Sequence, residues 1–513
     1  MSVEVIKVEY NNPQHAKHMI ELLDCYATDP MGGGVALSDF TAQNLVPALS
    51  QRPEAFSLIA YVDGQPAGLM NCFEGFSTFA CQPLVNVHDV VVAQATYSAT
   101  NSVLMTNVAN IAAIQPGSLV TGNGVGREVY VRSVDVAASQ ITLSQQLFDA
   151  EGTQEFTFTR FKYLLDFSGF EKLSDLVLDQ LELRCNGECS AVLTAPQGLM
   201  FQVHDCQFIR PKDRGITSHG DGCQGMVIDR CNFESDESAI PTQMRKSLCY
   251  NSNANDVKIR NNRAARFRHF GVMNGGQSII ANNHWFNGDD EAAGVRLGGL
   301  ILTKPNCATT VTGNYIDNNF IEWTDEHDAT ADVSGYSFGG LSITGNVFLA
   351  IDVQASYNWL VVKPYGVGHY INGLNVQGNI FRTFSGSIER VETVDTTYAN
   401  LDFDRMRNII FEGNAFNGVN EPTRNPHVDV HNQASVDATW TVDTQKYLPF
   451  GGFARTIESM VPLYAIRNGS NSAVFAQPFV SPKQGANDDE FHIVWPEPVK
   501  GQVRYSVRMD NPA

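Results

Sequence analysis

The sequence Ile343-Thr-Gly-Asn-Val-Phe348 is one copy of a short motif that recurs along the chain from Val203 onward. The motif is an apolar residue, then Asn or Cys three positions later, then an aromatic or aliphatic residue two positions after that. Eight copies follow one another at intervals of 21 to 35 residues, with the Asn or Cys at Cys206, Cys231, Asn262, Asn283, Asn314, Asn346, Asn379 and Asn414. Self-similarity at such a period indicates an array or solenoid.

The spacing inside the motif predicts the kind of solenoid. The residues between the copies favour strands and turns, and a residue two positions after the Asn faces the same way as the Asn in a strand. The apolar residue three positions before fits only if the chain bends at the Gly-Asn. A coil that turns a corner there stacks one Asn on the next, so that buried amides hydrogen-bond along the stack, with Cys206 and Cys231 as small apolar members. We therefore predict a mainly β protein built on a right-handed parallel β-helix.

Residues from about 100 to 450 resemble the pectin-lyase-like β-helix superfamily of polysaccharide lyases, polygalacturonases and phage tailspikes. More closely, they look like the glycosyl-hydrolase-28-related proteins of bacteria and their phages. The likeness is carried by RPKDRGITS (210–218), NANDVKIR (253–260), TGNYIDNNFIEWTDEHD (312–328) and WLVVKPYG (359–366). The resemblance implies a polysaccharide partner, a groove on the outer face of the first strand of each coil and, as in tailspikes, a homotrimer. The fold hosts several chemistries, so it does not imply one reaction.

The first 93 residues differ from the array. Apolar spacing predicts a helix over 13–26 and a second over 38–49, and Asp63-Gly64 between apolar runs predicts a hairpin. With strands before the helices and at 84–92, this order resembles the first half of a GCN5-related N-acetyltransferase. In that family a glycine-containing loop after the last of these strands binds the acetyl-CoA pyrophosphate. Here no glycine follows until Gly117, so we expect a truncated fragment that does not bind acetyl-CoA.

These patterns divide the chain into four parts. Residues 1–93 form the acetyltransferase-like segment, and residues 94–160 form a β-rich connector or cap. The β-helix occupies residues 161–450, and a C-terminal β-rich cap or tail occupies residues 451–513. A solenoid needs such caps because its open ends expose apolar side chains.

Acidic residues beside the array are the candidate catalytic groups. Glycoside hydrolysis uses two carboxylates about 5–9 Å apart, one of them kept protonated. The candidates are Asp289, Asp290, Glu322 and Asp325. The adjacent pair at 289–290 resembles the Asp pair of polygalacturonases, and loops from consecutive coils would bring an acid and a base to one bond. Two alternatives remain for the cluster at 322–328: a solvated loop, or a calcium site made of hard oxygen ligands. No other cofactor is implied.

Lysines and flat rings are the candidate substrate-binding groups. A lyase would use a cationic base such as Lys304 or Lys363, and aromatic rings stack on sugar rings through their flat apolar faces. The candidates are His219, Lys304, Trp323, Trp359, Lys363 and Tyr365, with Tyr357 and His369 as further rings. The alternatives are surface charge for the lysines and ordinary core packing for the rings.

Charge and composition exclude other classes of partner. The net charge of −20 repels nucleic acid and anionic membranes, and no stretch is apolar for long enough to span a bilayer. The start of the chain lacks the features of a secretory signal, and the ten cysteines include no Cys-x-x-Cys pair. We expect reduced thiols in a protein made in the cytoplasm and then associated with a particle or a surface.

Three functions are compatible with these observations. The first is a β-helix that binds, and in an enzymatic form cleaves, a polysaccharide. The second is a protein related to acetyltransferases, with acetyl transfer opposed by the missing loop. The third is a structural solenoid without catalysis.

Overall fold

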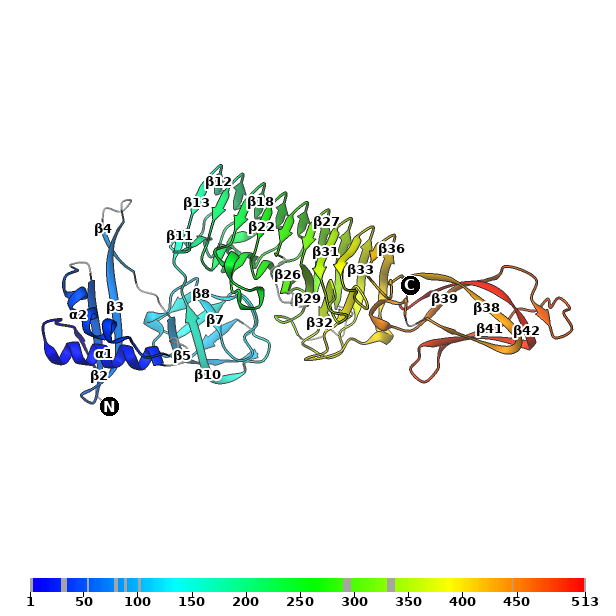
Figure 1. The fold of residues 1–513 in the computed structure, drawn as a ribbon, viewed down its shortest axis with the longest axis horizontal. Coiled ribbons are helices and arrows are strands. Elements are labelled where there is room, and N and C mark those ends of the chain that lie inside the picture. Colours follow the sequence, from blue (N-terminus) through cyan, green and yellow to red (C-terminus); the bar gives the residue numbers. More distant parts are fainter. Residues whose placement is uncertain are drawn as a thin grey trace. The chain divides into compact units, whose positions relative to one another are not determined.

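The computed structural model describes residues 3–28, 35–52, 55–77, 82–86, 90–99, 103–288, 297–329, 337–444 and 446–511. The chain forms two compact units, Met1–Asp89 and Val90–Ala513 (Figure 1). Within the described residues, no helix combines the length and the apolar character needed to cross a membrane.

The first unit is an antiparallel sheet with two helices. Its elements are β1 (Val3–Lys7), α1 (Pro13–Thr28), α2 (Asp39–Ser50), β2 (Ala55–Val62), β3 (Gln65–Ser77) and β4 (Gln82–Asn86), with sheet order β1-β2-β3-β4. Ser38 caps α2 by accepting the N–H of Thr41. Asp63 and Gly64 both have positive φ, as the predicted two-residue hairpin requires. The strand predicted over 84–92 is instead divided: β4 ends at Asn86, and Val90 begins a strand of the second unit.

The second unit begins with a small closed barrel. Its strands are β5 (Val90–Tyr97), β6 (Leu104–Thr106), β7 (Leu119–Thr121), β8 (Val129–Asp135), β9 (Gln140–Leu143) and β10 (Gly152–Thr159), joined in the order β10-β5-β6-β9-β8-β7. The barrel has its own core, which includes Val120, Ile141 and Phe156. The predicted boundary at residue 93 therefore falls inside β5, because the apolar run of that strand supplies one wall of the barrel.

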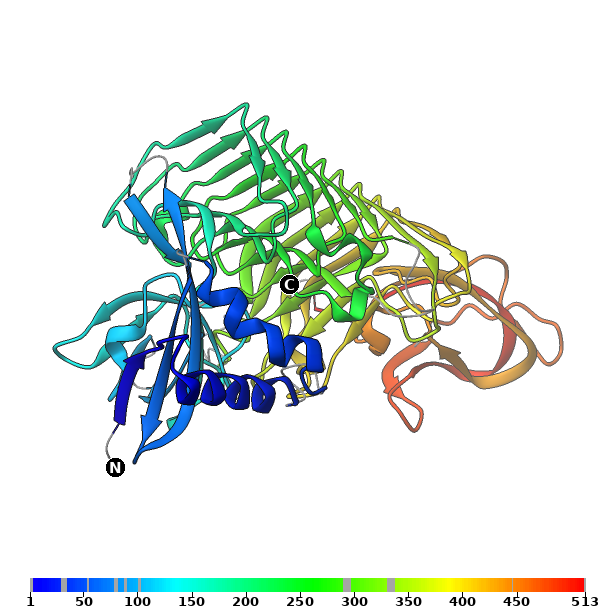
Figure 2. The ribbon, with the colours of Figure 1, turned by 60° about the vertical axis from the view of Figure 1, so that its left-hand side comes forward.

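The centre of the second unit is a parallel β-helix made of three nine-stranded sheets (Figures 1 and 2). We call them the first, second and third sheets in the order in which each coil visits them. The first sheet contains β11 (Tyr163–Asp166), β14 (Ser190–Leu193), β17 (Arg214–Thr217), β20 (Leu248–Ser252), β23 (His269–Met273), β26 (Leu297–Leu302), β29 (Asn319–Thr324), β32 (Leu360–Lys363) and β35 (Glu392–Val394). The second sheet contains β12 (Val177–Asp179), β15 (Gln202–His204), β18 (Val227–Asp229), β21 (Lys258–Arg260), β24 (Ile279–Ala281), β27 (Asn306–Thr312), β30 (Phe338–Thr344), β33 (Ile371–Gln377) and β36 (Arg407–Glu412). The third sheet contains β13 (Glu182–Arg184), β16 (Gln207–Ile209), β19 (Asn232–Glu234), β22 (Arg263–Ala265), β25 (His284–Phe286), β28 (Tyr315–Asp317), β31 (Val347–Asp352), β34 (Ile380–Ser385) and β37 (Ala415–Asn417).

The recurring motif forms the corner between the second and third sheets. The residue before each Asn has positive φ, which glycine adopts without strain; the angle is 65° at Gly313 and 64° at Gly345. Oδ1 of Asn283 accepts both the backbone N–H and the side-chain N–H of Asn262, at 3.1 and 3.0 Å. Its own side-chain N–H donates to the carbonyl oxygen of Ile259 in the preceding coil. The pattern continues to Asn414.

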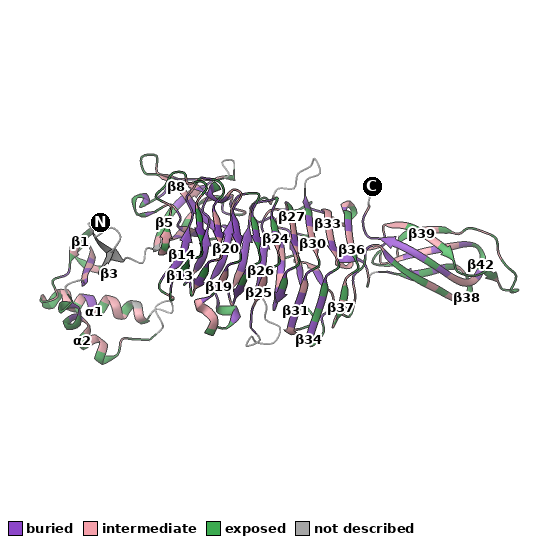
Figure 3. Ribbon diagram, turned by 90° about the horizontal axis from the view of Figure 1, so that it is seen from above, coloured by how far each residue is buried: buried purple, intermediate pink, exposed green. Residues whose placement is uncertain are grey.

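Apolar rings stack inside the coil in the same manner. The rings of Phe208 and Phe233 lie 4.2 Å apart, and those of Phe348 and Phe381 lie 4.8 Å apart, each pair nearly parallel. Figure 3 shows the buried residues running along the stacked strands. Identical residues in register therefore give the array one continuous core.

A five-stranded antiparallel sheet follows the last coil. It consists of β38 (His427–Asp443), β39 (Thr456–Pro462), β40 (Arg467–Asn468), β41 (Phe479–Gln484) and β42 (Glu490–Arg508). The described coils end at Asn417, so the predicted boundary at residue 450 lies inside this sheet region. The carboxylate of Asp510 accepts the N–H of Ile409 in β36, which joins the end of the chain to the last coil.

Candidate functional site

The barrel lies against the outer face of the first sheet. Arg127, in the barrel, donates from Nε to Glu326 at 3.0 Å and also pairs with Glu322 in β29. The ring nitrogens of His327 lie 2.9 and 3.0 Å from the carbonyl oxygens of Gln146 and Arg127. The acidic cluster predicted as a catalytic or solvated loop thus joins the barrel to the coil.

A second set of contacts joins the barrel to earlier coils. Arg214, in β17, donates to Glu128 at 3.1 Å and to the hydroxyl of Tyr130 at 3.3 Å. Burial raises the pKa of Tyr130 well above its usual value, and the charge of Glu128 adds to this rise. His219 is fully enclosed, and its ring nitrogens lie 2.9 and 3.3 Å from two backbone carbonyl oxygens. The substrate-binding role predicted for His219 is therefore wrong, since no ligand reaches the ring.

These contacts cover the face on which the resemblance implies a groove. Leu248, Val272 and Ile301 form an apolar cluster, separate from the main core, on strands of the first sheet. All three are at most 3% exposed. Hydrogen bonds join the barrel to this sheet at Arg214 in β17 and again at Glu322 in β29. Across these coils, the outer face of the first sheet is an internal interface rather than a substrate groove.

Two of the four predicted catalytic carboxylates, Glu322 and Asp325, lie within the described residues. Asp289 and Asp290 lie outside the described residues. Glu322 is paired with Arg127, and Asp325 is 0% exposed.

The predicted sugar-stacking rings belong mostly to the core. Trp323 and Trp359 are both 0% exposed, so the stacking role predicted for them is wrong. Trp323 faces inward from β29, in register with the buried Val362 of β32, whereas Trp359 directly precedes β32 and packs against Tyr357 and Phe381. Tyr357 is also buried. Tyr365 stacks on Tyr398, with ring centroids 4.3 Å apart, and packs edge-on against a phenylalanine of the barrel.

Lys363 is also engaged within the protein. Its Nζ lies 2.8 Å from the carboxylate of Asp395 in the next coil and 5.6 Å from the ring centroid of Tyr398. The amine of Lys363 is therefore already engaged by a carboxylate within the protein, so the structure does not favour a lyase role for it.

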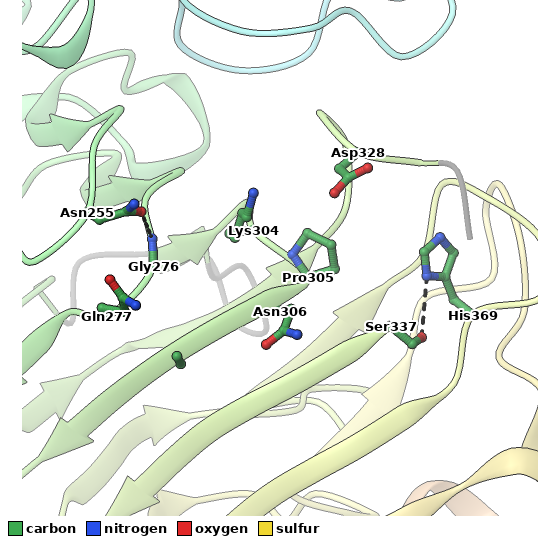
Figure 4. A pocket seen from close by; sticks show the side chains of 10 residues that line it. Asn255, Gly276, Gln277, Lys304, Pro305, Asn306, Asp328, Ser337 and His369 are labelled. Carbon is green, nitrogen blue, oxygen red and sulfur yellow. Dashed lines mark hydrogen bonds between the residues drawn. The ribbon is translucent and has the colours of Figure 1, made fainter. Parts of the chain in front are cut away.

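An open cleft lies at a different place, where the coil passes from the first sheet to the second. Its volume is about 470 Å³, and it is lined by Asn255, Gly276, Gln277, Lys304, Pro305, Asn306, Ala308, Asp328, Ser337 and His369 (Figure 4). Of the residues predicted to bind substrate, Lys304 and His369 line it. Its other polar groups are side-chain amides, one hydroxyl, one imidazole and the carboxylate of Asp328. Such groups are suited to a ligand rich in hydroxyls.

His369 and Ser337 make one wall of this cleft. Oγ of Ser337 lies 3.4 Å from Nδ1 of His369, and Oδ2 of Asp325 lies 2.8 Å from Nε2. Burial alone would lower the pKa of His369, but the contact with Asp325 outweighs it and raises that pKa above its usual value. Among the described residues, no group of three or more His, Cys, Asp or Glu side chains is placed to hold a metal ion.

The amides and Ser337 were not identified from the sequence. A signal was nevertheless present: Ser337 and His369 precede second-sheet strands of consecutive coils, and Asn306 begins such a strand. Polar residues at one corner in successive coils must lie side by side once the register is known.

No family model matches the chain. The sequence is 25% identical over 219 residues to the polygalacturonase QRT3 of Arabidopsis thaliana. That alignment covers 40% of this chain and 39% of the relative, so the match spans about two fifths of the relative's length. Two similar solved structures are the tailspike gp61 of Pseudomonas phage phi297 and a tailspike double mutant of E. coli bacteriophage HK620 in complex with a pentasaccharide. The first is 12% identical, with 82% of both chains covered and a TM-score of 0.36. The second is 10% identical, with 68% of this chain and 71% of the other covered and a TM-score of 0.31.

Proposed function

We propose that the protein binds a polysaccharide in the cleft between the first and second sheets. The observation that carries the proposal is the row of hydrogen-bonding side chains contributed by successive coils, from Asn255 and Gln277 through Lys304 and Asn306 to Asp328. Coils stack about 4.8 Å apart, so this row runs along the axis of the array and offers a polymer one set of donors and acceptors after another. Each of these groups is at least partly exposed.

The curated relative supports a polysaccharide ligand, because its name describes an enzyme that acts on polygalacturonate. Charge favours a different sugar in this protein. The chain has a net charge of −20, and Lys304 is balanced by Asp328 in the cleft. A polyanion would be repelled at long range, so we propose a neutral glycan.

Cleavage of the glycan is a second proposal, supported by the same relative. Hydrolysis through two carboxylates needs a partner for Asp328, which is the one carboxylate among the described residues of the lining. Asp289 and Asp290 remain candidates because they lie outside the described residues. If Asp289→Asn and Asp290→Asn both keep the full turnover of a glycan that the wild type cleaves, the carboxylates come from elsewhere. The assay is the release of reducing ends, with unsaturated uronate measured in parallel to detect a lyase.

Binding is tested with a glycan array followed by calorimetry on the best ligand. We expect Lys304→Ala and Gln277→Ala each to weaken binding by about tenfold or more, because each removes a buried or partly buried hydrogen bond to the ligand. Lys258→Ala is the matched control, since Lys258 is an exposed lysine of β21 outside the cleft. If no glycan binds, or if Lys304→Ala and Gln277→Ala bind as tightly as the wild type and the control, the protein is better described as a structural solenoid.

For the first unit, we propose an acetyltransferase-like scaffold that has lost its acetyl-CoA site. Its element order agrees with the predicted one, and Val90–Tyr97 enters the barrel where a pyrophosphate loop would have to follow. We expect calorimetry with acetyl-CoA to show no binding. A micromolar dissociation constant would contradict this proposal.

We also propose a homotrimer associated with a particle or a surface. The C-terminal sheet and the connections between its strands expose large apolar side chains, including Tyr464, Phe475 and Phe479, which are 70% to 98% exposed. Exposed apolar groups of this size favour association. Sedimentation equilibrium tests the proposal, and a monomer at micromolar concentration would contradict it.

A further inference from the structure

We propose that the cleft also carries a serine hydrolase site that removes small O-acyl groups from a bound glycan. Ser337 is the nucleophile, His369 is the base, and Asp325 is the positioning residue. The identity of the natural substrate rests on the proposed glycan binding, whereas the reactivity of Ser337 does not.

The fold brings the three residues together from two consecutive coils. Asp325 directly follows β29 and Ser337 directly precedes β30, so both belong to one connection between the first and second sheets. His369 belongs to the next connection and lies two residues before β33. The parallel pairing of β30 with β33, and of β29 with β32, stacks the two connections on each other. Figure 4 shows the resulting contact between Ser337 and His369 at the side of the cleft.

The surroundings of His369 determine which ring nitrogen carries the proton. Nε2 faces two acceptors, the carbonyl oxygen of Ala329 at 3.2 Å and Oδ2 of Asp325 at 2.8 Å. The Asp325 oxygen lies outside hydrogen-bond geometry, so that contact is electrostatic. Two acceptors at Nε2 require a proton there, which leaves the lone pair of Nδ1 directed at Ser337. This is the tautomer that a general base needs.

Backbone groups orient the other two members. Oγ of Ser337 accepts the N–H of Tyr370 at 2.7 Å, so its own hydrogen is left to donate to Nδ1 of His369. Oδ1 of Asp325 accepts the N–H of Tyr365 at 2.6 Å. The ring of Phe338 packs edge-on against the imidazole, with centroids 5.5 Å apart. A nucleophile, a base and an orienting carboxylate therefore stand in a chain of contacts.

The reaction that this arrangement supports is acyl transfer to water. Oγ of Ser337 attacks the ester carbonyl carbon while its proton passes to Nδ1 of His369. The tetrahedral intermediate collapses, the bond to the sugar oxygen breaks, and that oxygen takes the proton from His369. Water then attacks the acyl-serine and gives one proton to His369, and the released serine oxygen recovers it. The products are a carboxylic acid and the free sugar hydroxyl, and neither an oxidant nor a metal is needed.

The cleft limits the substrate to small esters. Ser337 is only 5% exposed, which admits an acetyl group more readily than a long acyl chain. A glycosidic bond has no carbonyl carbon to attack, so the triad acts on a substituent of the sugar and not on the chain.

The N–H of Phe338 already donates to the carbonyl oxygen of Tyr370, so the oxyanion must be stabilised by side-chain donors. Lys304 and Asn306 line the same cleft and carry such donors.

The first test uses the wild-type protein alone. A fluorophosphonate probe should label the protein, and peptide mass spectrometry should place the label on Ser337. Acetylated xylan should release acetate. If the probe labels no site and no acetate is released from the polymer or from p-nitrophenyl acetate, the proposal is overturned, whatever any variant does.

The second test uses matched variants. Ser337→Ala should lose the label and lower acetate release by about 100-fold or more. Ser342→Ala is the control, because Ser342 lies in the same strand, β30, and accepts a hydrogen bond from Asn375 on the outer face. Full acetate release by Ser337→Ala would overturn the proposal. If that variant does not fold, the position of the label on the wild type decides.

The positioning role of Asp325 has a separate readout. Because Asp325 raises the pKa of His369, Asp325→Asn should move the acidic limb of the pH–rate profile to lower pH as well as reduce kcat. A reduced rate with an unmoved limb would contradict that role. Glycan binding that persists in Ser337→Ala without acetate release by the wild type would leave the proposed function intact and remove only this inference.

Discussion

Two corners of the same coil use polar side chains in opposite ways. At the corner between the second and third sheets, one Asn repeats from coil to coil, and the partner of each Asn is the next Asn. At the corner between the first and second sheets, the described residues form no such continuous ladder. There Glu326 is paired with Arg127, about two hundred positions earlier in the chain. A polar residue that repeats in register therefore hydrogen-bonds to its copies in the neighbouring coils, whereas one that occurs once finds its partner in another domain or in a ligand.

The largest loss of stability is expected where the polar residues that do not repeat contact the barrel. Arg127→Met leaves Glu322 and Glu326 without their cation, and their side chains are only 12% and 2% exposed. Breaking a buried ion pair from one side costs about 3–5 kcal/mol, because the remaining charge stays buried. We expect a loss of this size in the free energy of unfolding of the second unit, measured by urea denaturation. Hydrogen exchange should show the barrel amides opening first.

Arg132→Met is the control for this prediction. Arg132 pairs with Asp221 at 2.8 Å, but the side chain of Asp221 is 63% exposed, so we expect a loss of at most about 1 kcal/mol. Equal losses in the two variants would mean that the barrel is not held by Arg127.

The same comparison shows what could be predicted from the sequence. The asparagine ladder, which runs from Asn262 to Asn414, was predictable residue by residue. Both partners of each Asn-to-Asn bond, such as Asn314 and Asn346, belong to one pattern that is visible in the sequence. The cluster at 322–328 was noticed, but its role was not predictable, because nothing near it in the sequence points to Arg127. For Trp323 and Trp359, sugar stacking and core packing both stayed open, because whether a ring faces in or out of the first sheet depends on where its coil turns. Ser337 was missed because one serine before a strand carries no signal until two coils are stacked.

An intermediate effect is expected in the ladder itself. Asn346→Leu leaves the backbone and side-chain N–H groups of Asn314 without their acceptor and removes the donor to Asn379. We expect the free energy of unfolding to fall by roughly 1–3 kcal/mol, the usual cost of leaving buried polar groups unpaired. Urea denaturation again measures it.

Asn417→Leu is the matched substitution outside the ladder. Asn417 ends β37 and is exposed, so the change should stay within about 0.5 kcal/mol. An unchanged stability in Asn346→Leu would mean that the ladder bonds are replaced by water or by a shift of the corner, and the contrast between the two corners would then lose its energetic basis.

The smallest effect is a pH dependence that only the corner with the cleft should show. The pKa of His369 is raised, because the contact with Asp325 and the charge of Asp328 outweigh its burial. A histidine with a higher pKa in the folded state stabilises the fold fully below its unfolded pKa of about 6.5, and the contribution is lost as the pH rises through the folded value. Stability should therefore decline slightly from about pH 6.5 upward, and Asp325→Asn should abolish the decline. His219 cannot mimic this, because burial lowers its pKa and its contribution to stability is lost as the pH falls.

Acetate release should rise over the same pH interval, since the base must be neutral, so activity and stability should move in opposite directions. A decline that survives Asp325→Asn would assign the titration to another group, whereas the asparagine ladder has no ionisable side chain and should show no such dependence.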